Sequence, residues 1–163
     1  MNARNRFGLG LSVLLAFLVT ILVRCSTTPS VTVPPGTTFV VYALDGDTYP
    51  MSSPDWRDSG FHGWPIVQHC SITNSKGVEL LDELLSDAAS ANPLQVDCFN
   101  PRHGLRVESS SGTVDYVICF ECFRFETWTE GREGHQSGAI TQGPESLFSA
   151  TLKNCRPQET VEP

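Results

Sequence analysis

Apolar and polar residues follow regular intervals along much of the chain, and these intervals predict its strands. Residues 37–44 and 66–72 are short apolar runs rich in β-branched and aromatic side chains, which favours two strands. Residues 105–108 alternate, residues 109–112 have the composition of a turn, and residues 114–128 alternate again. We therefore expect an antiparallel hairpin whose second strand is long.

The long strand changes parity part-way along its length. Ile118 and Phe120 fall on one face, whereas Phe123 and Phe125 fall on the opposite face if the alternation is continuous. A β-bulge near Glu121 would return all four aromatic and aliphatic side chains to the same face. We therefore expect the bulge to lie inside the Cys-x-x-Cys sequence at residues 119–122.

Two segments have helical periodicity. Residues 76–91 carry an apolar side chain at every third or fourth position and acidic side chains on the other side. Asn74 or Ser75 can cap the start of this helix. Pro144 is typical of the first turn of a second helix, whose apolar stripe ends at Cys155. This stripe predicts that Cys155 points into the core.

The order of these elements predicts the fold class. Residues 49–63 and 129–143 are polar and rich in glycine, serine or proline, so we expect loops there. The remaining elements indicate an α+β fold, with an antiparallel sheet of four or more strands covered on one face by two helices. We expect a single domain over residues 37–156 and a disordered tail over residues 157–163.

The N-terminus has a different pattern from the rest of the chain. Residues 7–23 form an uncharged hydrophobic run with arginines on both sides, so residues 1–25 are typical of a signal peptide or an N-terminal membrane anchor helix. The arginines before the run favour a cytoplasmic N-terminus and a domain exported to the periplasm or the cell surface. The Ser/Thr/Pro-rich residues 26–36 predict a linker.

The charge of the domain argues against nucleic acid as a partner. Three of the eleven Lys and Arg residues lie before residue 25, which leaves eight of them against eighteen Asp and Glu and a formal net charge of −10 for residues 25–163. Nucleic-acid binding depends on many basic contacts to phosphates. The sequence also lacks a phosphate-binding Gly-rich loop, a nucleophile-elbow serine and a His-Glu-x-x-His pair. We therefore do not expect nucleic acid as a partner. The hydrophobic N-terminus predicts the membrane as one partner, while the sequence does not specify a protein or small-molecule partner.

Five cysteines follow residue 25, and pairing is one explanation for them: Cys70, Cys98, Cys119, Cys122 and Cys155. Thiols oxidise outside the cytoplasm, so two disulfides and one unpaired thiol would suit a non-enzymatic binding or structural domain without a cofactor. On a regular strand the Cα atoms of Cys119 and Cys122 would lie about 10 Å apart, so each would pair elsewhere. We expect the strands to gather the sulfur atoms into one neighbourhood.

A zinc site is a second explanation. Cys98, His103, Cys119 and Cys122 supply three sulfurs and one imidazole, a ligand set that suits tetrahedral zinc. A bulge at Glu121 would bring the last two thiolates to one side of the strand. The spacing of the four residues nevertheless differs from that of a zinc ribbon.

Thiol–disulfide exchange is a third explanation. A catalytic Cys-x-x-Cys needs its first sulfur at a helix N-terminus or beside a cation, and the residues after Cys122 have the pattern of a strand. Arg102, His103 and Arg124 could supply the positive charge if they fold back over Cys119. His62 becomes a further site candidate if the fold brings it to the cysteines.

Three short sequences carry a resemblance. They are Phe-His-Gly-Trp at 61–64, Cys-Phe-x-Pro-Arg-His-Gly at 98–104 and Ile-Cys-Phe-x-Cys at 118–122. Together they resemble a group of small bacterial proteins that are exported or anchored in the membrane. The resemblance implies a location outside the cytoplasm, and it assigns neither a catalytic residue nor a cofactor.

Overall fold

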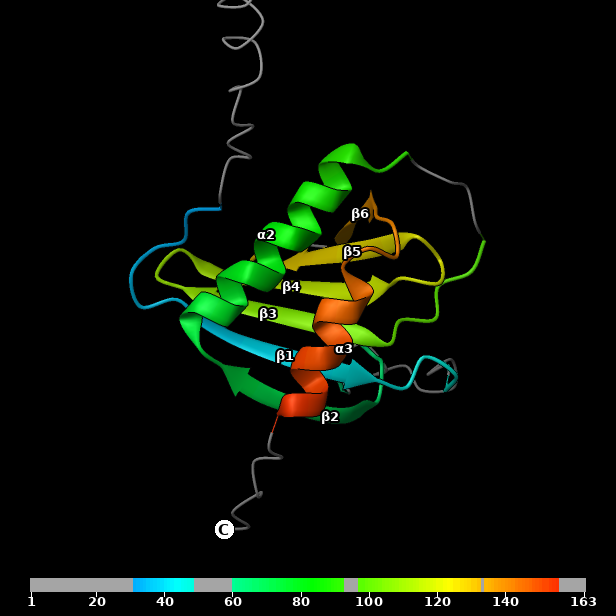
Figure 1. Ribbon diagram of the computed structural model, residues 1–163, viewed down its shortest axis with the longest axis horizontal. Helices are drawn as coiled ribbons and strands as arrows, with labels where there is room; N and C mark the ends of the chain where they lie inside the picture. Colours follow the sequence, from blue (N-terminus) through cyan, green and yellow to red (C-terminus); the bar gives the residue numbers. More distant parts are fainter. Residues whose placement is uncertain (1–30, 49–59, 93–96, 133, 156–163) are drawn as a thin grey trace, which may run out of the picture. The chain divides into compact units, whose positions relative to one another are not determined.

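Six strands and two helices lie in the part of the chain that the computed structural model describes, which is residues 31–48, 60–92, 97–132 and 134–155. Along these residues the order is β1 (Thr38–Leu44), β2 (Ile66–Ile72), α2 (Asn74–Ser90), β3 (His103–Ser109), β4 (Gly112–Cys119), β5 (Arg124–Thr129), β6 (His135–Ala139) and α3 (Glu145–Asn154). The strands form one six-stranded sheet in the order β2-β1-β3-β4-β5-β6, and every neighbouring pair is antiparallel (Figure 1). The expected α+β fold with an antiparallel sheet is confirmed.

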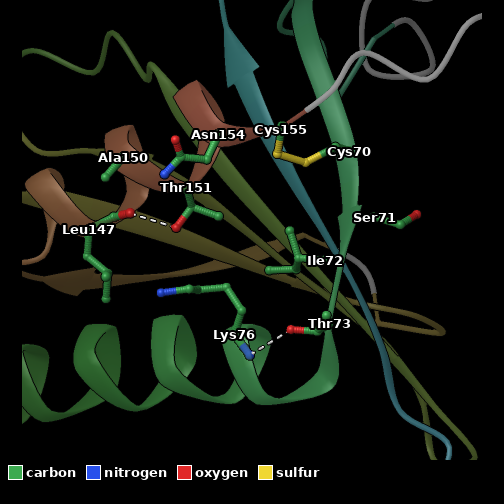
Figure 2. A pocket seen from close by; sticks show the side chains of 10 residues that line it. All are labelled: Cys70, Ser71, Ile72, Thr73, Lys76, Leu147, Ala150, Thr151, Asn154 and Cys155. Carbon is green, nitrogen blue, oxygen red and sulfur yellow. Dashed lines mark hydrogen bonds between the residues drawn. A yellow bond between two sulfur atoms is a disulfide. The ribbon is translucent and has the colours of Figure 1, made fainter.

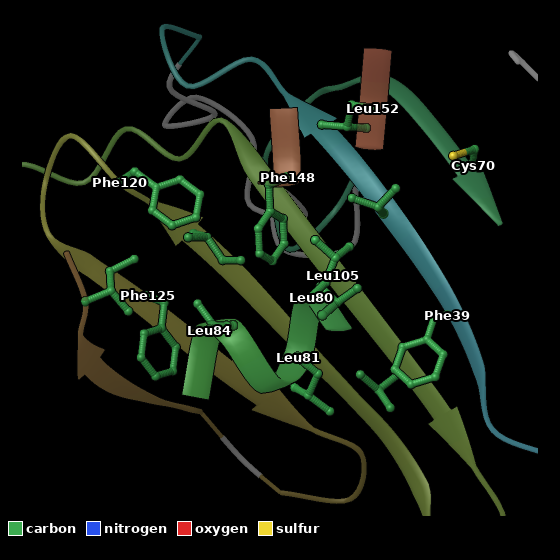
Figure 3. Packing of buried hydrophobic residues seen from close by; sticks show 14 residues of the cluster. Phe39, Cys70, Leu80, Leu81, Leu84, Leu105, Phe120, Phe125, Phe148 and Leu152 are labelled. Carbon is green, nitrogen blue, oxygen red and sulfur yellow. The ribbon is translucent and has the colours of Figure 1, made fainter. Parts of the chain in front are cut away.

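Both helices pack on the same face of the sheet, which we call the helix face (Figure 1). Alternation along β1, β3, β4 and β5 supplies most of the apolar side chains that the helices cover. Leu80 and Leu84 of α2 and Phe148 of α3 are fully buried against them. Figure 3 shows this core, in which the sheet contributes Phe39, Val41, Leu105, Val107, Ile118 and Phe125.

The main helix forms where its periodicity predicts it, but with a different cap. Thr73 Oγ1 accepts the Lys76 N–H at 3.4 Å, so Thr73 is the N-cap rather than Asn74 or Ser75. Asn74 instead donates from its side chain to the Thr37 carbonyl at 3.0 Å. This bond connects the start of α2 to the residue before β1.

The expected long strand over residues 114–128 is wrong. The chain reverses direction at a four-residue turn, so β4 ends at Cys119 and β5 starts at Arg124, and these two residues are partners across the ladder. The Phe123 N–H donates to the Phe120 carbonyl at 3.2 Å, and Phe123 has a φ of 53°. The change of parity therefore marks a turn and not a bulge.

The expected loop over residues 129–143 contains a strand. Residues His135–Ala139 pair with β5 and form the edge strand β6, although their sequence His-Gln-Ser-Gly-Ala has no apolar alternation. The pairing is explained by β5, which offers unsatisfied backbone groups along its free side. Gly138 makes the approach possible, because a Cβ atom there would overlap the Phe125 ring.

Part of the expected linker belongs to the folded domain. Val31 and Val33 pack against the core, and the Val31 N–H donates to Asp82 Oδ1 at 2.8 Å. Alternate valines give this segment an apolar side that its Ser/Thr/Pro composition conceals. The expected signal or anchor over residues 1–25 and the expected tail over 157–163 lie outside the described residues. Within the described residues, neither helix is long and apolar enough to cross a bilayer.

Candidate functional site

Three of the cysteines meet at one end of the sheet. β3 begins beside the point where β4 ends, because the two strands are antiparallel and His103 is the partner of Ile118. Cys98 lies in the segment that leads into β3, while Cys119 ends β4 and Cys122 lies in the turn that follows. The turn thus brings Cys122 back toward the start of β3.

The segment before β3 is held in place by its backbone. The Arg102 N–H donates to the Ile118 carbonyl at 3.2 Å, and the Arg102 carbonyl accepts the Leu44 N–H at 3.0 Å. Gly46 lies so close to this segment that a Cβ atom there would be 2.7 Å from the carbonyl carbon of Asn100. These contacts fix the direction from which Cys98 approaches the turn.

The three thiols form a contiguous group, which we call the thiol cluster (Cys98, Cys119 and Cys122). Cys98 Sγ lies 2.6 Å from Cys122 Sγ, and the Cys122 thiol also interacts with the Cys119 thiol. Cys119 and Cys122 are only 1% and 2% exposed, whereas Cys98 is exposed. One sulfur, Cys122, therefore contacts the other two, and the outer one faces solvent.

The surroundings make two of these thiols weaker acids than an ordinary cysteine. The hydrogen bond to Cys122 raises the pKa of the Cys98 thiol above its usual range. Burial raises the pKa of the Cys122 thiol in the same direction. Both groups are therefore protonated near neutral pH when the cluster is reduced, whereas a catalytic thiol needs a lowered pKa.

His103 does not join the thiol cluster. Its partner Ile118 packs in the core on the helix face, so the next residue, Cys119, projects from the opposite face of the sheet. The His103 ring contacts the rings of Phe120 and Phe148, and its Nε2 lies 3.1 Å from Ser149 Oγ. Burial lowers the pKa of His103 to about 4, and the positive charge of Arg102 adds to this effect.

The expected four-ligand metal set therefore does not meet at one point. Cys98, Cys119 and Cys122 are together, while His103 lies across the sheet from them. Among the residues that the structure describes, no group of three or more His, Cys, Asp or Glu side chains is arranged to hold a metal ion.

The two candidate arginines are each held by an acid. Arg102 forms an exposed ion pair with Asp47 at 2.9 Å. Arg124 donates to Glu126 Oε1 at 2.6 Å, and its guanidinium lies over the Phe99 ring at 4.9 Å from the centroid. Arg102 is close to Cys98 in the sequence, and Arg124 is the ladder partner of Cys119. The carboxylates of Asp47 and Glu126 nevertheless offset the charges of these two arginines.

His62 lies in a different network, on the face of the sheet opposite the helices, which we call the second face. Asp115 is 4% exposed and accepts two bonds from Arg106, both at 2.8 Å, while His62 Nε2 lies 2.7 Å from Asp115 Oδ2. The His62 ring stacks on Trp128 at 4.7 Å between centroids, and Trp128 in turn contacts His135 at 4.9 Å.

His62 has a backbone φ of 52°, which is uncommon for a residue with a side chain. Such a conformation persists where the surroundings fix it, and Asp115 and Trp128 do so from two sides. Hydrogen bonds to Arg106 and to His62 lower the pKa of Asp115 in spite of its burial. The Asp115 carboxylate is therefore charged at neutral pH, and both of its oxygens have hydrogen-bond partners.

One ion pair of this network, between Arg106 and Asp115, could have been predicted from the sequence of the hairpin. A turn centred between residues 110 and 111 makes Arg106 the partner of Asp115, and both residues have the polar parity of their strands. Opposite charges at facing positions predict an ion pair. His135 lies on β6, which the sequence did not indicate.

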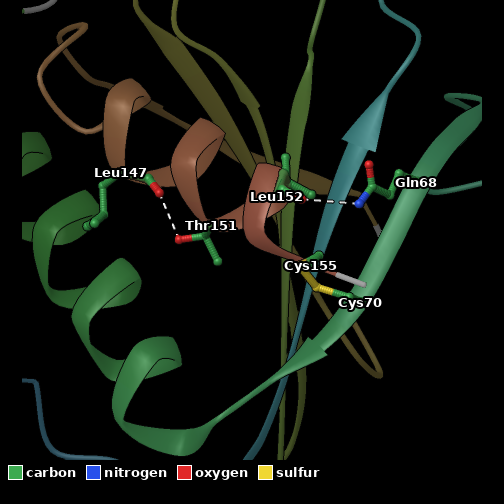
Figure 4. Close-up of a disulfide and its surroundings, with 6 residues drawn as sticks. All are labelled: Gln68, Cys70, Leu147, Thr151, Leu152 and Cys155. Atoms are coloured by element: carbon green, nitrogen blue, oxygen red, sulfur yellow. Dashed lines mark hydrogen bonds between the residues drawn. A yellow bond between two sulfur atoms is a disulfide. The ribbon is translucent and has the colours of Figure 1, made fainter. Parts of the chain in front are cut away.

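The remaining two cysteines form a disulfide on the helix face. Cys70 of β2 is bonded to Cys155, the residue after α3, with Cα atoms 6.1 Å apart (Figure 4). Next to it, Gln68 Nε2 donates to the Leu152 carbonyl at 3.1 Å. Cys70 on β2 and Cys119 on β4 are three positions apart in the strand order, so the sulfurs form two groups and not the single neighbourhood that we expected.

A pocket of about 530 Å³ adjoins this disulfide (Figure 2). It lies between the end of β2, the first turn of α2 and one side of α3, with Ile72 and Leu147 as apolar lining. Lys76 extends toward it but is paired with Glu79 at 2.7 Å. The pocket therefore lacks a free charged group to orient a ligand.

Comparison with protein-family models, with curated proteins and with solved structures finds no match for the chain. The resemblance of its three short sequences to exported bacterial proteins therefore stays a prediction.

Proposed function

We propose that the chain is an exported, membrane-anchored domain of the cell envelope or surface, non-enzymatic, which binds a protein partner through the second face of its sheet. Disulfides stabilise this domain. The observation that carries the proposal is the 2.6 Å separation of Cys98 Sγ and Cys122 Sγ, which are free thiols in the structure but close enough to be oxidised to a disulfide, in addition to the separate disulfide between Cys70 and Cys155. Two bonded pairs are typical of a protein that folds outside the cytoplasm.

The distance favours a disulfide over a metal site. Two thiolates bound to tetrahedral zinc with bonds of about 2.3 Å lie about 3.8 Å from each other. The sulfurs of Cys98 and Cys122 are more than 1 Å closer than that. A zinc-like site or a thiol-redox enzyme at Cys98, Cys119 and Cys122 is the alternative function, and the raised pKa values of Cys98 and Cys122 argue against the enzyme.

The second face is the proposed binding surface because its side chains are ordered but not covered by the helices. The rings of His62, Trp128 and His135 contact one another in series beside the ion pair of Arg106 and Asp115. Aromatic and arginine side chains are enriched where proteins bind one another. The unusual backbone of His62 supports a role beyond packing, since residues fixed in such conformations cluster at functional sites.

Stepwise alkylation tests the disulfides. The full chain, taken from the envelope without reductant, is alkylated in denaturant, reduced, and labelled with a second reagent before peptide mapping. We expect Cys70, Cys122, Cys155 and one of the other two cysteines to react only after reduction, and the remaining thiol of the cluster to react before it. Reaction of all five cysteines before reduction would contradict the proposal, and so would one zinc per chain whose removal exposes the thiol cluster.

Photocrosslinking in cells tests the binding surface. A photoreactive amino acid replaces exposed His135 on the second face or, as the matched control, exposed Glu79 on α2. We expect a discrete crosslinked product from position 135 and none from position 79. No product from position 135, or the same products from both positions, would reject the second face as the binding surface.

A further inference from the structure

The described part of the chain has an odd number of cysteines, and the thiol cluster holds the odd one. Cys70 and Cys155 are bonded to each other, which leaves three sulfurs for one further disulfide. Cys122 interacts with both of the others, so it is the sulfur that either disulfide must include. The choice decides which thiol remains: Cys119, at 1% exposure, or Cys98, which is exposed.

The turn makes both pairings geometrically reasonable. Cys119 ends β4, and the chain reverses over the next four residues, so Cys122 is not three residues further along an extended strand. A disulfide needs Cα atoms within about 7 Å, which a tight turn provides and a straight strand does not. Cys98 reaches the same sulfur from the neighbouring segment, which the backbone bonds of Arg102 hold in place.

Resting on the proposed disulfide, we propose that the thiol cluster is a thiol-exchange site, in which Cys122 is bonded to Cys98 in one form and to Cys119 in the other. In the exchange, the Cys119 thiolate attacks Cys122 Sγ, the bond between Cys122 and Cys98 breaks, and Cys98 leaves as a thiolate that takes up the proton lost by Cys119. One disulfide is broken and one is formed, so no oxidant is consumed.

The exchange replaces the buried Cys119 thiol with the exposed Cys98 thiol. The site can then react with small-molecule disulfides. The Cys98 thiolate can attack a small-molecule disulfide such as oxidised glutathione, which forms a mixed disulfide on Cys98 and releases one equivalent of the small thiol. The chain then carries the disulfide between Cys119 and Cys122 and one covalently attached thiol compound. Without exchange, the remaining thiol is Cys119, which its burial keeps from such a reagent.

Tryptic peptides separate the two forms of the full-length oxidised protein. Cleavage after Lys76, Arg102, Arg106 and Arg124 puts Cys98 on one peptide and both Cys119 and Cys122 on another. The first form gives the two peptides joined by a disulfide. The second form gives a peptide with an internal disulfide and a separate Cys98 peptide that carries an alkyl group or, after oxidised glutathione, one glutathionyl group.

The test compares the wild type with Cys119→Ser under native conditions at mildly alkaline pH, with thermal unfolding to check that the variant is folded. We expect Cys98 to be labelled at least about tenfold faster in the wild type than in the variant, together with the internal disulfide. Equal, slow labelling with the two peptides still joined in both proteins would overturn the exchange and leave the proposed function intact. Absence of both the joined peptides and the internal disulfide would overturn the proposed function itself. Cys119→Ala supplies the same comparison if Cys119→Ser fails to fold.

Discussion

His62 Nε2 lies 2.7 Å from an oxygen of Asp115 that also accepts a bond from Arg106. The histidine comes from the loop before β2, and the aspartate and arginine come from the hairpin of β3 and β4. One nearly buried carboxylate therefore connects the loop to the sheet.

The first prediction concerns this carboxylate. Asp115→Asn keeps the shape of the side chain but removes the charge that both partners share, so we expect a loss of about 2 kcal/mol in the free energy of unfolding. The value is below that of a fully buried pair because Arg106 is 34% exposed. Urea denaturation measures it. As the control, Asp47→Asn breaks the exposed pair with Arg102 and should cost less than about 0.5 kcal/mol. Equal losses in the two variants would contradict this account.

The second prediction concerns acid. The pKa of His103 is lowered to about 4, so between this value and its unfolded value near 6.5 the unfolded chain binds more protons than the folded chain. Stability therefore rises with pH across this window. We expect the wild type to lose about 2 kcal/mol more than His103→Gln between about pH 7 and about pH 4.5.

Denaturation at several pH values measures this difference. Asp115 also loses its stabilising contribution in acid, but this loss takes place as the pH falls from the ordinary carboxyl pKa of 3.8 toward the lowered pKa of Asp115, and it is equal in both proteins. His69→Gln, which alters an exposed histidine on β2, is the control and should keep the wild-type slope. Parallel curves for the wild type and His103→Gln would show that burial does not hold this imidazole neutral.

Periodicity predicted the elements whose apolar side chains face the helices. The second strand agrees with the expected residues Ile66–Ile72, and the helix at Asn74–Ser90 begins within two residues of its expected start. The helix packs on one side only, so its sequence carries the full period of the structure. The second strand was instead predicted from its apolar composition, and it leaves Ile66 and Val67 exposed.

The turn between β4 and β5 could not be predicted in the same way. Phe120, Glu121, Cys122 and Phe123 include none of the residues that usually mark a tight turn, and Phe123 takes a positive φ that a β-turn normally assigns to Gly or Asn. A bulge and a turn change the parity of a strand alike. Only the pairing of Cys119 with Arg124 distinguishes them.

The same limit applies to the candidate metal ligands. Whether His103 and Cys119 share a face depends on the register of β3 against β4, and a shift of one residue reverses the answer. The observed register places His103 opposite Ile118. The sequence therefore predicted the gathering of Cys98, Cys119 and Cys122 near one another but could not decide the position of the imidazole.

The third prediction concerns the disulfide on the helix face. Cys70 and Cys155 are 85 positions apart, so their bond restricts most of the unfolded domain. The chain-entropy treatment of such a loop gives a stabilisation of about 4–5 kcal/mol. We expect Cys70→Ser/Cys155→Ser to lose most of this amount in urea denaturation without reductant. Cys119→Ala, which removes a thiol outside this bond, is the control and should lose much less. A double variant as stable as the wild type would show that the bond does not form in the isolated protein.

The fourth prediction concerns the contact between α2 and β1. Gly77 is buried, and a Cβ atom at this position would overlap the ring of Phe39, which is 1% exposed. Gly→Ala in a helix normally adds about 1 kcal/mol of stability, but the overlap should reverse the sign and cost about 1–3 kcal/mol. Gly77→Ala/Phe39→Leu provides the room that the methyl group needs, so it should be more stable than the sum of the two single changes implies. Thermal or urea unfolding of the four proteins measures this coupling. Additive effects would mean that Gly77 is required for another reason.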